Sequence, residues 1–172
     1  MAEARLRVVL DTNVLIAGVR FPRWPHEVME AAVQGRFEVL LPEQVLTEAH
    51  RHIETAAQRR ALTSFLARCG YREVPRPSPD RVEANLDLVR DRSDVPLALA
   101  LLDAQVDIFV TSDRDFTDPG ATATRFAEQV QVMLPAVFLN RIVGWPSESL
   151  EAIRFRRWED LPPDPSEGEA AP

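Results

Sequence analysis

Cysteine is nearly absent from this chain of 172 residues, and lysine is missing altogether. The single Cys69 cannot form an internal disulfide and provides no metal-ligand cluster. No uninterrupted apolar stretch approaches the length of a membrane span. The N-terminus also lacks a basic leader followed by an apolar core, so we expect no signal peptide. These absences favour a cytoplasmic protein that makes no contact with a membrane.

The acidic charge of the chain is concentrated at its C-terminus. There are 27 acidic against 20 basic residues, a net charge of −7, but residues 159–172 hold five acids and no base. The rest of the chain is therefore close to neutral, with 22 acidic and 20 basic residues. Every basic residue is arginine, whose planar guanidinium suits bidentate contacts to phosphate. The composition thus permits a nucleic-acid partner.

The hydrophobic pattern alternates between strand-like and helix-like segments. Strands are expected at 6–10, 37–41, 107–111 and 130–133, with a short edge strand at 71–74. The helices expected between and after them cover residues 14–19, 25–34, 42–53, 56–68, 80–89, 95–105 and 135–142. Strands that alternate with helices predict an α/β fold with a parallel sheet covered on both faces.

The pattern predicts one domain, residues 1–144, followed by a C-terminal extension, residues 145–172. The extension begins with a helix signal at Ser147, continues through a basic and aromatic run at 154–158, and ends in an acidic, proline-rich segment that we expect to be disordered. Phe and Trp side chains prefer burial, so we expect the run at 154–158 to dock on its own domain or on a second copy.

Two of the predicted strands end in a carboxylate. Asp11 follows the first strand, and Asp113 follows the strand at 107–111. In a parallel sheet both side chains would emerge at the carboxyl edge, where α/β folds bind ligands, and they would repel each other unless a hard cation lay between them. A helix N-cap at Asp11 and a polar turn at Asp113 are the alternatives. Nearby polar residues suited to supporting such ligands are Asn13, Thr111 and Ser112.

Three further acids are ambiguous by themselves. Asp94 lies two residues before Pro96 at the start of an apolar helix, where it suits an N-cap as well as a metal ligand. Glu48 lies at the border of an apolar helix face, where Glu is usually solvated. Asp115 is equally compatible with a solvent-facing position or an ion pair with Arg114.

Four segments, taken together, resemble the PIN-domain family in order and spacing: 9–15, 45–48, 93–98 and 110–116. The resemblance covers roughly residues 5–142 and is closest to the toxin components of toxin–antitoxin systems (VapC-like ribonucleases). It implies a three-layer α/β/α sandwich around a parallel sheet. It places Asp11, Glu48, Asp94 and Asp113 on the acidic quartet of the family, Asp115 near an occasional fifth acid, and Asn13 on the small polar residue that supports the first Asp.

The resemblance also implies an endoribonuclease that depends on one or two Mg²⁺ or Mn²⁺ ions. An oxygen-only ligand set suits these ions better than zinc. Asp11, Asp94 and Asp113 would be direct ligands, with Glu48 binding directly or through water. Single-stranded or loop RNA is the more accessible substrate, and the residues proposed to contact it are Arg20, Arg23, Trp24 and Arg114. The family further implies an antitoxin partner and a homodimer.

Two alternatives differ in function. A catalytically silent PIN scaffold would bind RNA or a protein partner without cleavage, but such a scaffold has no need of four mutually repelling carboxylates. A phosphatase with an aspartate nucleophile requires a second Asp two residues after the first, and this chain has Asn13 at that position. The sequence therefore favours the nuclease.

Overall fold

The computed structural model describes residues 4–163 and contains a five-stranded, all-parallel sheet in the order β3-β2-β1-β4-β5. The strands are β1 (Arg7–Leu10), β2 (Glu38–Pro42), β3 (Arg72–Val74), β4 (Ile108–Val110) and β5 (Gln131–Met133). The central strand β1 pairs on both sides, so that Val9 lies opposite Leu40 of β2 and Phe109 of β4. The predicted strands, including the short edge strand, are confirmed.

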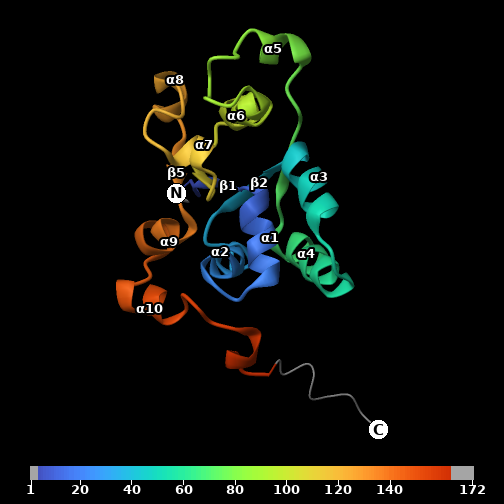
Figure 1. Cartoon of the computed structure of the whole chain (residues 1–172), viewed down its shortest axis with the longest axis vertical. Coiled ribbons are helices and arrows are strands. Elements are labelled where there is room, and N and C mark those ends of the chain that lie inside the picture. Colours follow the sequence, from blue (N-terminus) through green and yellow to red (C-terminus); the bar gives the residue numbers. More distant parts are fainter. Residues whose placement is uncertain (1–3, 164–172) are drawn as a thin grey trace.

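Helices cover both faces of this sheet (Figure 1). On one face, α1 and α2 pack against each other and are surrounded by α3, α4 and α9, while α6 packs on the other face together with α5. Their bounds are α1 (Thr12–Arg20), α2 (Trp24–Val33), α3 (Glu43–His52), α4 (Ala56–Cys69), α5 (Pro79–Glu83), α6 (Val95–Asp103), α7 (Arg114–Thr117), α8 (Thr124–Ala127), α9 (Pro135–Phe138) and α10 (Ser147–Ala152). The expected three-layer α/β/α architecture is confirmed.

The two central strands lie entirely in the core. Val8, Val9 and Leu10 of β1 and Phe109 and Val110 of β4 have no exposed surface. Such continuous burial requires cover on both faces, which is why these strands show an unbroken apolar run in place of alternation. The sheet is therefore a rigid base for the residues that follow each strand.

The expected helix over 80–89 is wrong in extent. Helix α5 ends at Glu83, and the chain then turns until Val89 forms an isolated antiparallel bridge with Thr122. Leu88 and Val89 are buried there, so tertiary packing of these two side chains outweighs the weak helical tendency of the segment. The expected helix over 135–142 is also shorter: α9 continues into a π-helical turn, Leu139–Val143.

Helices α1 and α2 approach closely at Gly18. A Cβ atom at this position would lie 2.2 Å from Met29 Sδ and 3.3 Å from the backbone nitrogen of His26. Only glycine fits this crossing without a shift of the neighbouring helix. This contact brings α2 close to α1, the helix that Asp11 caps.

The C-terminal extension docks on its own domain. We call its described part, residues 145–163, the C-terminal strap. The Trp24 indole N–H donates to the carbonyl of Leu150 at 2.8 Å, and the Arg156 guanidinium pairs with the largely buried Glu27 and donates to the carbonyl of Pro22. The extension thus docks on the parent domain as expected, but the two aromatic side chains whose burial was the reason for that expectation stay exposed, Phe155 at 73% and Trp158 at 43%. The expected disordered end lies outside the described residues from 164 onward. Within residues 4–163, no helix has both the length and the apolar character needed to cross a bilayer.

Candidate metal centre

The carboxyl ends of β1 and β4 meet at the centre of the sheet. Asp11 directly follows β1, and its backbone N–H donates to the carbonyl of Val110, the last residue of β4, at 3.0 Å. Parallel strands that end side by side place their following residues at one edge. The structure therefore brings Asp11 to the same edge as Thr111, Ser112 and Asp113.

Asp11 is buried, with 7% of its surface exposed. One carboxylate oxygen, Oδ1, accepts from the backbone N–H of Thr12 at 2.8 Å and caps helix α1. The other, Oδ2, accepts from the Thr111 hydroxyl at 2.7 Å and from the Asn13 amide at 3.1 Å. The N-cap interpretation is thus correct, and it coexists with a second set of contacts that fixes the carboxylate at the sheet edge.

Thr111 connects Asp11 with Asp113. Its hydroxyl oxygen accepts from the backbone N–H of Asp113 at 3.0 Å while its proton is donated to Asp11. Asn13 reinforces the link, because its side-chain oxygen accepts from the backbone N–H of Ser112 at 3.2 Å. Ser112 joins this network through its backbone, whereas its hydroxyl was the group expected to contribute. Asp113 itself caps α7, where its Oδ1 accepts from the N–H of Asp115 at 2.9 Å.

Glu48 lies on α3 and faces the start of α1. Its Oε2 accepts from the Thr12 hydroxyl at 3.2 Å, and its Oε1 accepts from the Gln44 amide at 3.3 Å. The side chain is partly buried, so the solvated position expected from the helix pattern alone is not what the structure has. Glu48 is oriented toward the Asp11 end of helix α1.

Asp94 occupies the N-cap position of α6 without capping it. Within the described part of the chain, its side chain accepts no capping hydrogen bond from that helix. Asp91 instead caps the preceding turn, where its Oδ1 accepts from the backbone and the hydroxyl of Ser93 at 2.9 and 2.7 Å. The Asp94 carboxylate is consequently left available for other contacts.

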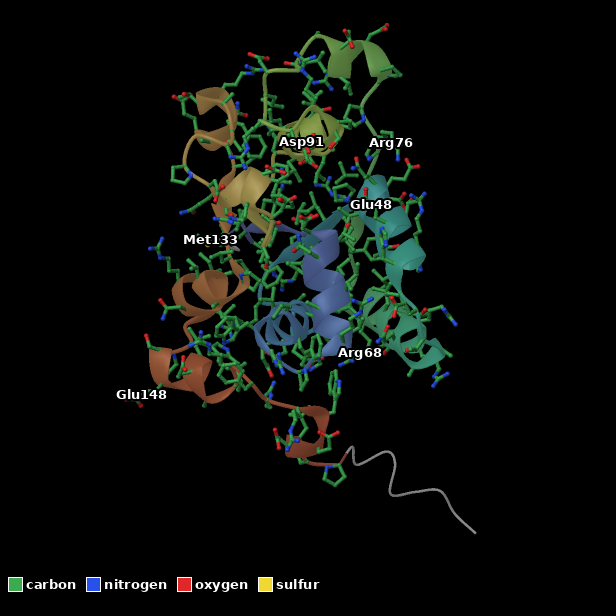
Figure 2. All side chains as sticks on the ribbon, viewed as in Figure 1. Glu48, Arg68, Arg76, Asp91, Met133 and Glu148 are labelled. Carbon is green, nitrogen blue, oxygen red and sulfur yellow. The ribbon has the colours of Figure 1, made fainter. Side chains whose placement is uncertain are left out.

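Asp91 is the residue that the sequence did not single out. Carboxylate oxygens of Asp91, Asp94 and Asp115 lie within 4.8 Å of one another. Figure 2 shows Asp91 beside α6 and Glu48 on α3. Asp91 reaches this position because the bridge between Val89 and Thr122 carries the chain back to the sheet edge, which is a tertiary contact with no local sequence signal.

The gathered carboxylates perturb one another. Burial raises the pKa of Asp11 from 3.8 to about 6, and the nearby charges of Asp113 and Glu48 add to this effect against the lowering influence of its hydrogen bonds. Burial also raises the pKa of Asp94 to about 7, followed by repulsion from neighbouring acids, first Asp113 and then Asp91. Loss of hydration is the main reason that these charges are unfavourable, and their mutual repulsion adds to it.

These residues fit a hard divalent cation. All of the converging donors are carboxylate oxygens, which Mg²⁺ and Mn²⁺ prefer, and the group lacks the imidazole and thiolate ligands typical of zinc. The charge of a divalent cation would offset the repulsion that adds to the effect of burial on the pKa values of Asp11 and Asp94. The carboxylate oxygens close enough together to share one cation are those of Asp91, Asp94 and Asp115, within 4.8 Å of one another, and Asp11 and Asp113 lie at the same edge of the sheet.

Asp115 has a different partner from the one expected. Its Oδ1 accepts from Nη2 and Nε of Arg90 at 2.6 and 3.1 Å, in place of an ion pair with Arg114. Arg114 instead approaches Asp118 at 3.6 Å, and 86% of its side chain is exposed. Arg114 therefore lies beside the carboxylates with its guanidinium accessible.

Arg23 and Trp24 contact the C-terminal strap. The Arg23 guanidinium donates to the carbonyl of Arg156 at 3.2 Å, and Trp24 donates to the strap as described above. Arg20 meets the strap only through its backbone carbonyl, which accepts from the Trp158 indole at 2.9 Å, while its guanidinium donates to the carbonyl of His52 at 3.2 Å. Arg20 ends α1, whereas Asp11 precedes the N-terminal end of that helix. An RNA contact by Arg20, Arg23 or Trp24 stays a prediction.

A parallel α/β fold with carboxylates gathered at the carboxyl edge of its sheet defines a class of metal-binding candidates. Within that class, a family model described as PIN domain matches residues 7–115, more than half of the chain. The chain belongs to the PIN-domain family. All of the predicted quartet lies inside the matched segment, and the C-terminal strap lies outside it.

A solved structure supports the fold. The crystal structure of PAE2754 from Pyrobaculum aerophilum is similar to this chain with a TM-score of 0.53 and 14% sequence identity, over 81% of this chain and 97% of that chain. At this identity the likeness concerns the fold alone. No curated protein matches the chain in sequence.

Proposed function

We propose that this PIN domain is a Mg²⁺- or Mn²⁺-dependent endoribonuclease. The observation that carries the proposal is that the carboxylates of Asp91, Asp94 and Asp115 lie within 4.8 Å of one another at the sheet edge that also holds Asp11 and Asp113. A protein pays for such repulsion with stability, which is expected at a functional site. The PIN-domain fold supports a nuclease reaction, since the family is typically nucleolytic.

The proposed mechanism assigns a separate task to each group. Asp11, Asp94 and Asp113 would hold one or two cations, which when bound supply charge stabilisation at the phosphate and a lowered pKa for water. Thr111 and Asn13 fix the Asp11 carboxylate so that it does not rotate away from the site. Glu48, held by Thr12 and Gln44, is positioned to orient the attacking water.

The proposed substrate is single-stranded or loop RNA. A flexible single strand can splay its bases apart for contact with a protein in a way that paired bases cannot. Arg114 is the proposed contact to a phosphate near the cleaved bond, because its exposed guanidinium lies next to Asp113 and Asp115 in the chain. Bidentate pairing of arginine with phosphate would place the strand across the carboxylates.

The test compares cleavage by matched variants. The purified chain is incubated with a fluorescent single-stranded RNA in Mn²⁺, in Mg²⁺ and with excess chelator. We expect cleavage that needs the cation and is lost in Asp11→Asn. Glu43→Gln, an exposed glutamate on the same helix as Glu48, is the control and should keep full activity. Equal cleavage by wild type and Asp11→Asn would refute the proposal, and RNA bound intact would support a silent scaffold.

We further propose that the protein is the toxin of a toxin–antitoxin pair and forms a homodimer. This part rests on the resemblance of its motifs to the toxin branch of the family. Induced expression in a bacterium should arrest growth, Asp11→Asn should abolish the arrest, and co-expression of a small neighbouring protein should relieve it. Normal growth at a confirmed high level of active enzyme would refute the toxin role.

A further inference from the structure

The Arg90 guanidinium makes several polar contacts beside the carboxylates of Asp91, Asp94 and Asp115. Its Nη2 and Nε both donate to Oδ1 of Asp115, at 2.6 and 3.1 Å. Nη2 also donates to the carbonyl of Arg114 at 3.3 Å and lies 3.5 Å from a carboxylate oxygen of Asp118. The Arg90 guanidinium is thus already paired with groups of its own chain and is not a free binding site for a phosphate group.

The backbones of both partners are anchored. The N–H of Arg90 donates to the carbonyl of Ala121 at 2.7 Å, and the preceding residue, Val89, is buried and bridged to Thr122. Asp115 belongs to α7, where its N–H donates to Oδ1 of Asp113 at 2.9 Å and the next residue, Phe116, is buried. Because neither backbone depends on the ion pair, what Arg90 fixes is the orientation of the Asp115 side chain.

The contact leaves half of the Asp115 carboxylate unused. Both guanidinium nitrogens reach the same oxygen, Oδ1, and Oδ2 accepts no hydrogen bond from any residue in the range 4–163. A carboxylate oxygen of Asp115 lies within 4.8 Å of those of Asp91 and Asp94. An acid held on one oxygen and open on the other is oriented toward its neighbours.

We propose that Arg90 is a positioning residue of the cation site: it holds the Asp115 carboxylate beside those of Asp91 and Asp94 and thereby increases the affinity of the site for a divalent cation. This inference rests on the proposed metal-dependent function. The proposed influence of Arg90 on cation affinity is not an effect of its charge alone. Removal of a positive charge close to a cation site strengthens cation binding if electrostatics alone decides, whereas loss of a positioned ligand weakens it. The two explanations therefore predict opposite signs.

The test measures Mn²⁺ binding to the metal-free full-length chain by isothermal titration calorimetry. Arg90→Gln should bind Mn²⁺ about tenfold more weakly than wild type, the scale typical of lost ligand support. Arg125→Gln is the matched control, because Arg125 forms a similar exposed, two-nitrogen pair with Asp87, at 2.9 and 3.0 Å. The control should bind Mn²⁺ like wild type. Unchanged or tighter binding by Arg90→Gln would overturn the proposal.

A double-mutant cycle separates positioning from general loss of structure. If Arg90 acts through Asp115, then Asp115→Asn should weaken Mn²⁺ binding at least as much as Arg90→Gln, and the double variant should be no weaker than Asp115→Asn alone. Additive losses would overturn the proposal, as would an Asp115→Asn variant that binds normally. Absence of Mn²⁺ binding by wild type would reject the metal site itself, and with it both this inference and the proposed function.

Discussion

Replacement of Asp11 by Asn should stabilise the metal-free protein. The pKa of Asp11 is raised from 3.8 to about 6, mainly by burial. At pH 8 the carboxylate is ionised in both the folded and the unfolded chain, so this difference corresponds to about 3 kcal/mol of lost stability. Asn has the same shape without the charge and removes this penalty.

Part of the gain is offset by hydrogen bonding. Oδ1 of Asp11 accepts from the Thr12 N–H, and Oδ2 accepts from Thr111 and Asn13. An asparagine amide has a single oxygen, so its NH2 group faces a donor at one of these two positions, which costs about 1 kcal/mol. The net effect at pH 8 is a gain of about 2 kcal/mol, equivalent to a Tm higher by about 4–8 °C for a chain of this length. The folded protein should then be more stable although a residue of the site is lost.

The gain should depend on pH in a defined direction. Because the pKa of Asp11 is higher in the folded state, the folded chain binds more protons than the unfolded chain between pH 3.8 and about 6. The wild-type protein therefore loses stability as the pH rises through this window, and the penalty is complete above pH 6. The advantage of Asp11→Asn should shrink to well under about 1 kcal/mol at pH 5.

Thermal and urea unfolding in chelator, at pH 5 and pH 8, measure this prediction. Saturating Mn²⁺ should reverse the order of stability, because a cation present at a hundred times its Kd adds about 2.7 kcal/mol to a protein that binds it. The reasoning is refuted if Asp11→Asn is less stable than wild type at pH 8 without metal. It is also refuted if the advantage is the same at both pH values.

Three further predictions concern packing and catalysis. Gly18→Ala should lower the free energy of unfolding by about 1–2 kcal/mol in urea titrations, because the Met29 side chain must move aside and the backbone of Pro25 and His26, 3.3 Å from the new Cβ, must shift; an unchanged midpoint would contradict the crossing described. Glu27→Gln should cost about 1–2 kcal/mol, since Arg156 loses a largely buried ionic partner, and protection of the C-terminal strap from limited proteolysis should fall in parallel. Glu48→Gln should reduce kcat for RNA cleavage by about 10- to 100-fold with little change in KM, and a normal rate would remove Glu48 from the proposed mechanism.

The strands and most helices were predictable because their side chains obey local rules. The apolar run of β1 and the β-branched run of β4 are buried as their composition indicates. The failures occur where a distant contact decides. Residues after Glu83 leave the helical conformation because Leu88 and Val89 are buried beside the loop that contains Thr122. That loop lies about thirty residues later in the chain, so the local sequence around Leu88 does not predict the contact.

The residues of the candidate site likewise divide into those that sequence rules predict and those that only distant contacts place. Asp11 and Asp113 were predictable because strand ends in a parallel sheet have a known meeting point. Asp91 was not, because a solvent-exposed acid before a turn has an ordinary capping role, which it also fulfils. The contacts of Arg23 and Trp24 with the C-terminal strap could not be predicted for another reason: arginine and tryptophan suit RNA and protein contacts equally well, and the sequence does not show where the strap lies.

The pairing of β1 with β4 has a consequence for synthesis of the protein. Asp11 is translated before Val110 and Thr111, which hold its backbone and carboxylate from about a hundred residues later in the chain. Until that segment has left the ribosome, β1 lacks one of its two neighbours and Asp11 lacks its partners. Such non-local pairing forms late. The proposed ribonuclease site is therefore incomplete until residues 110–113 have emerged from the ribosome.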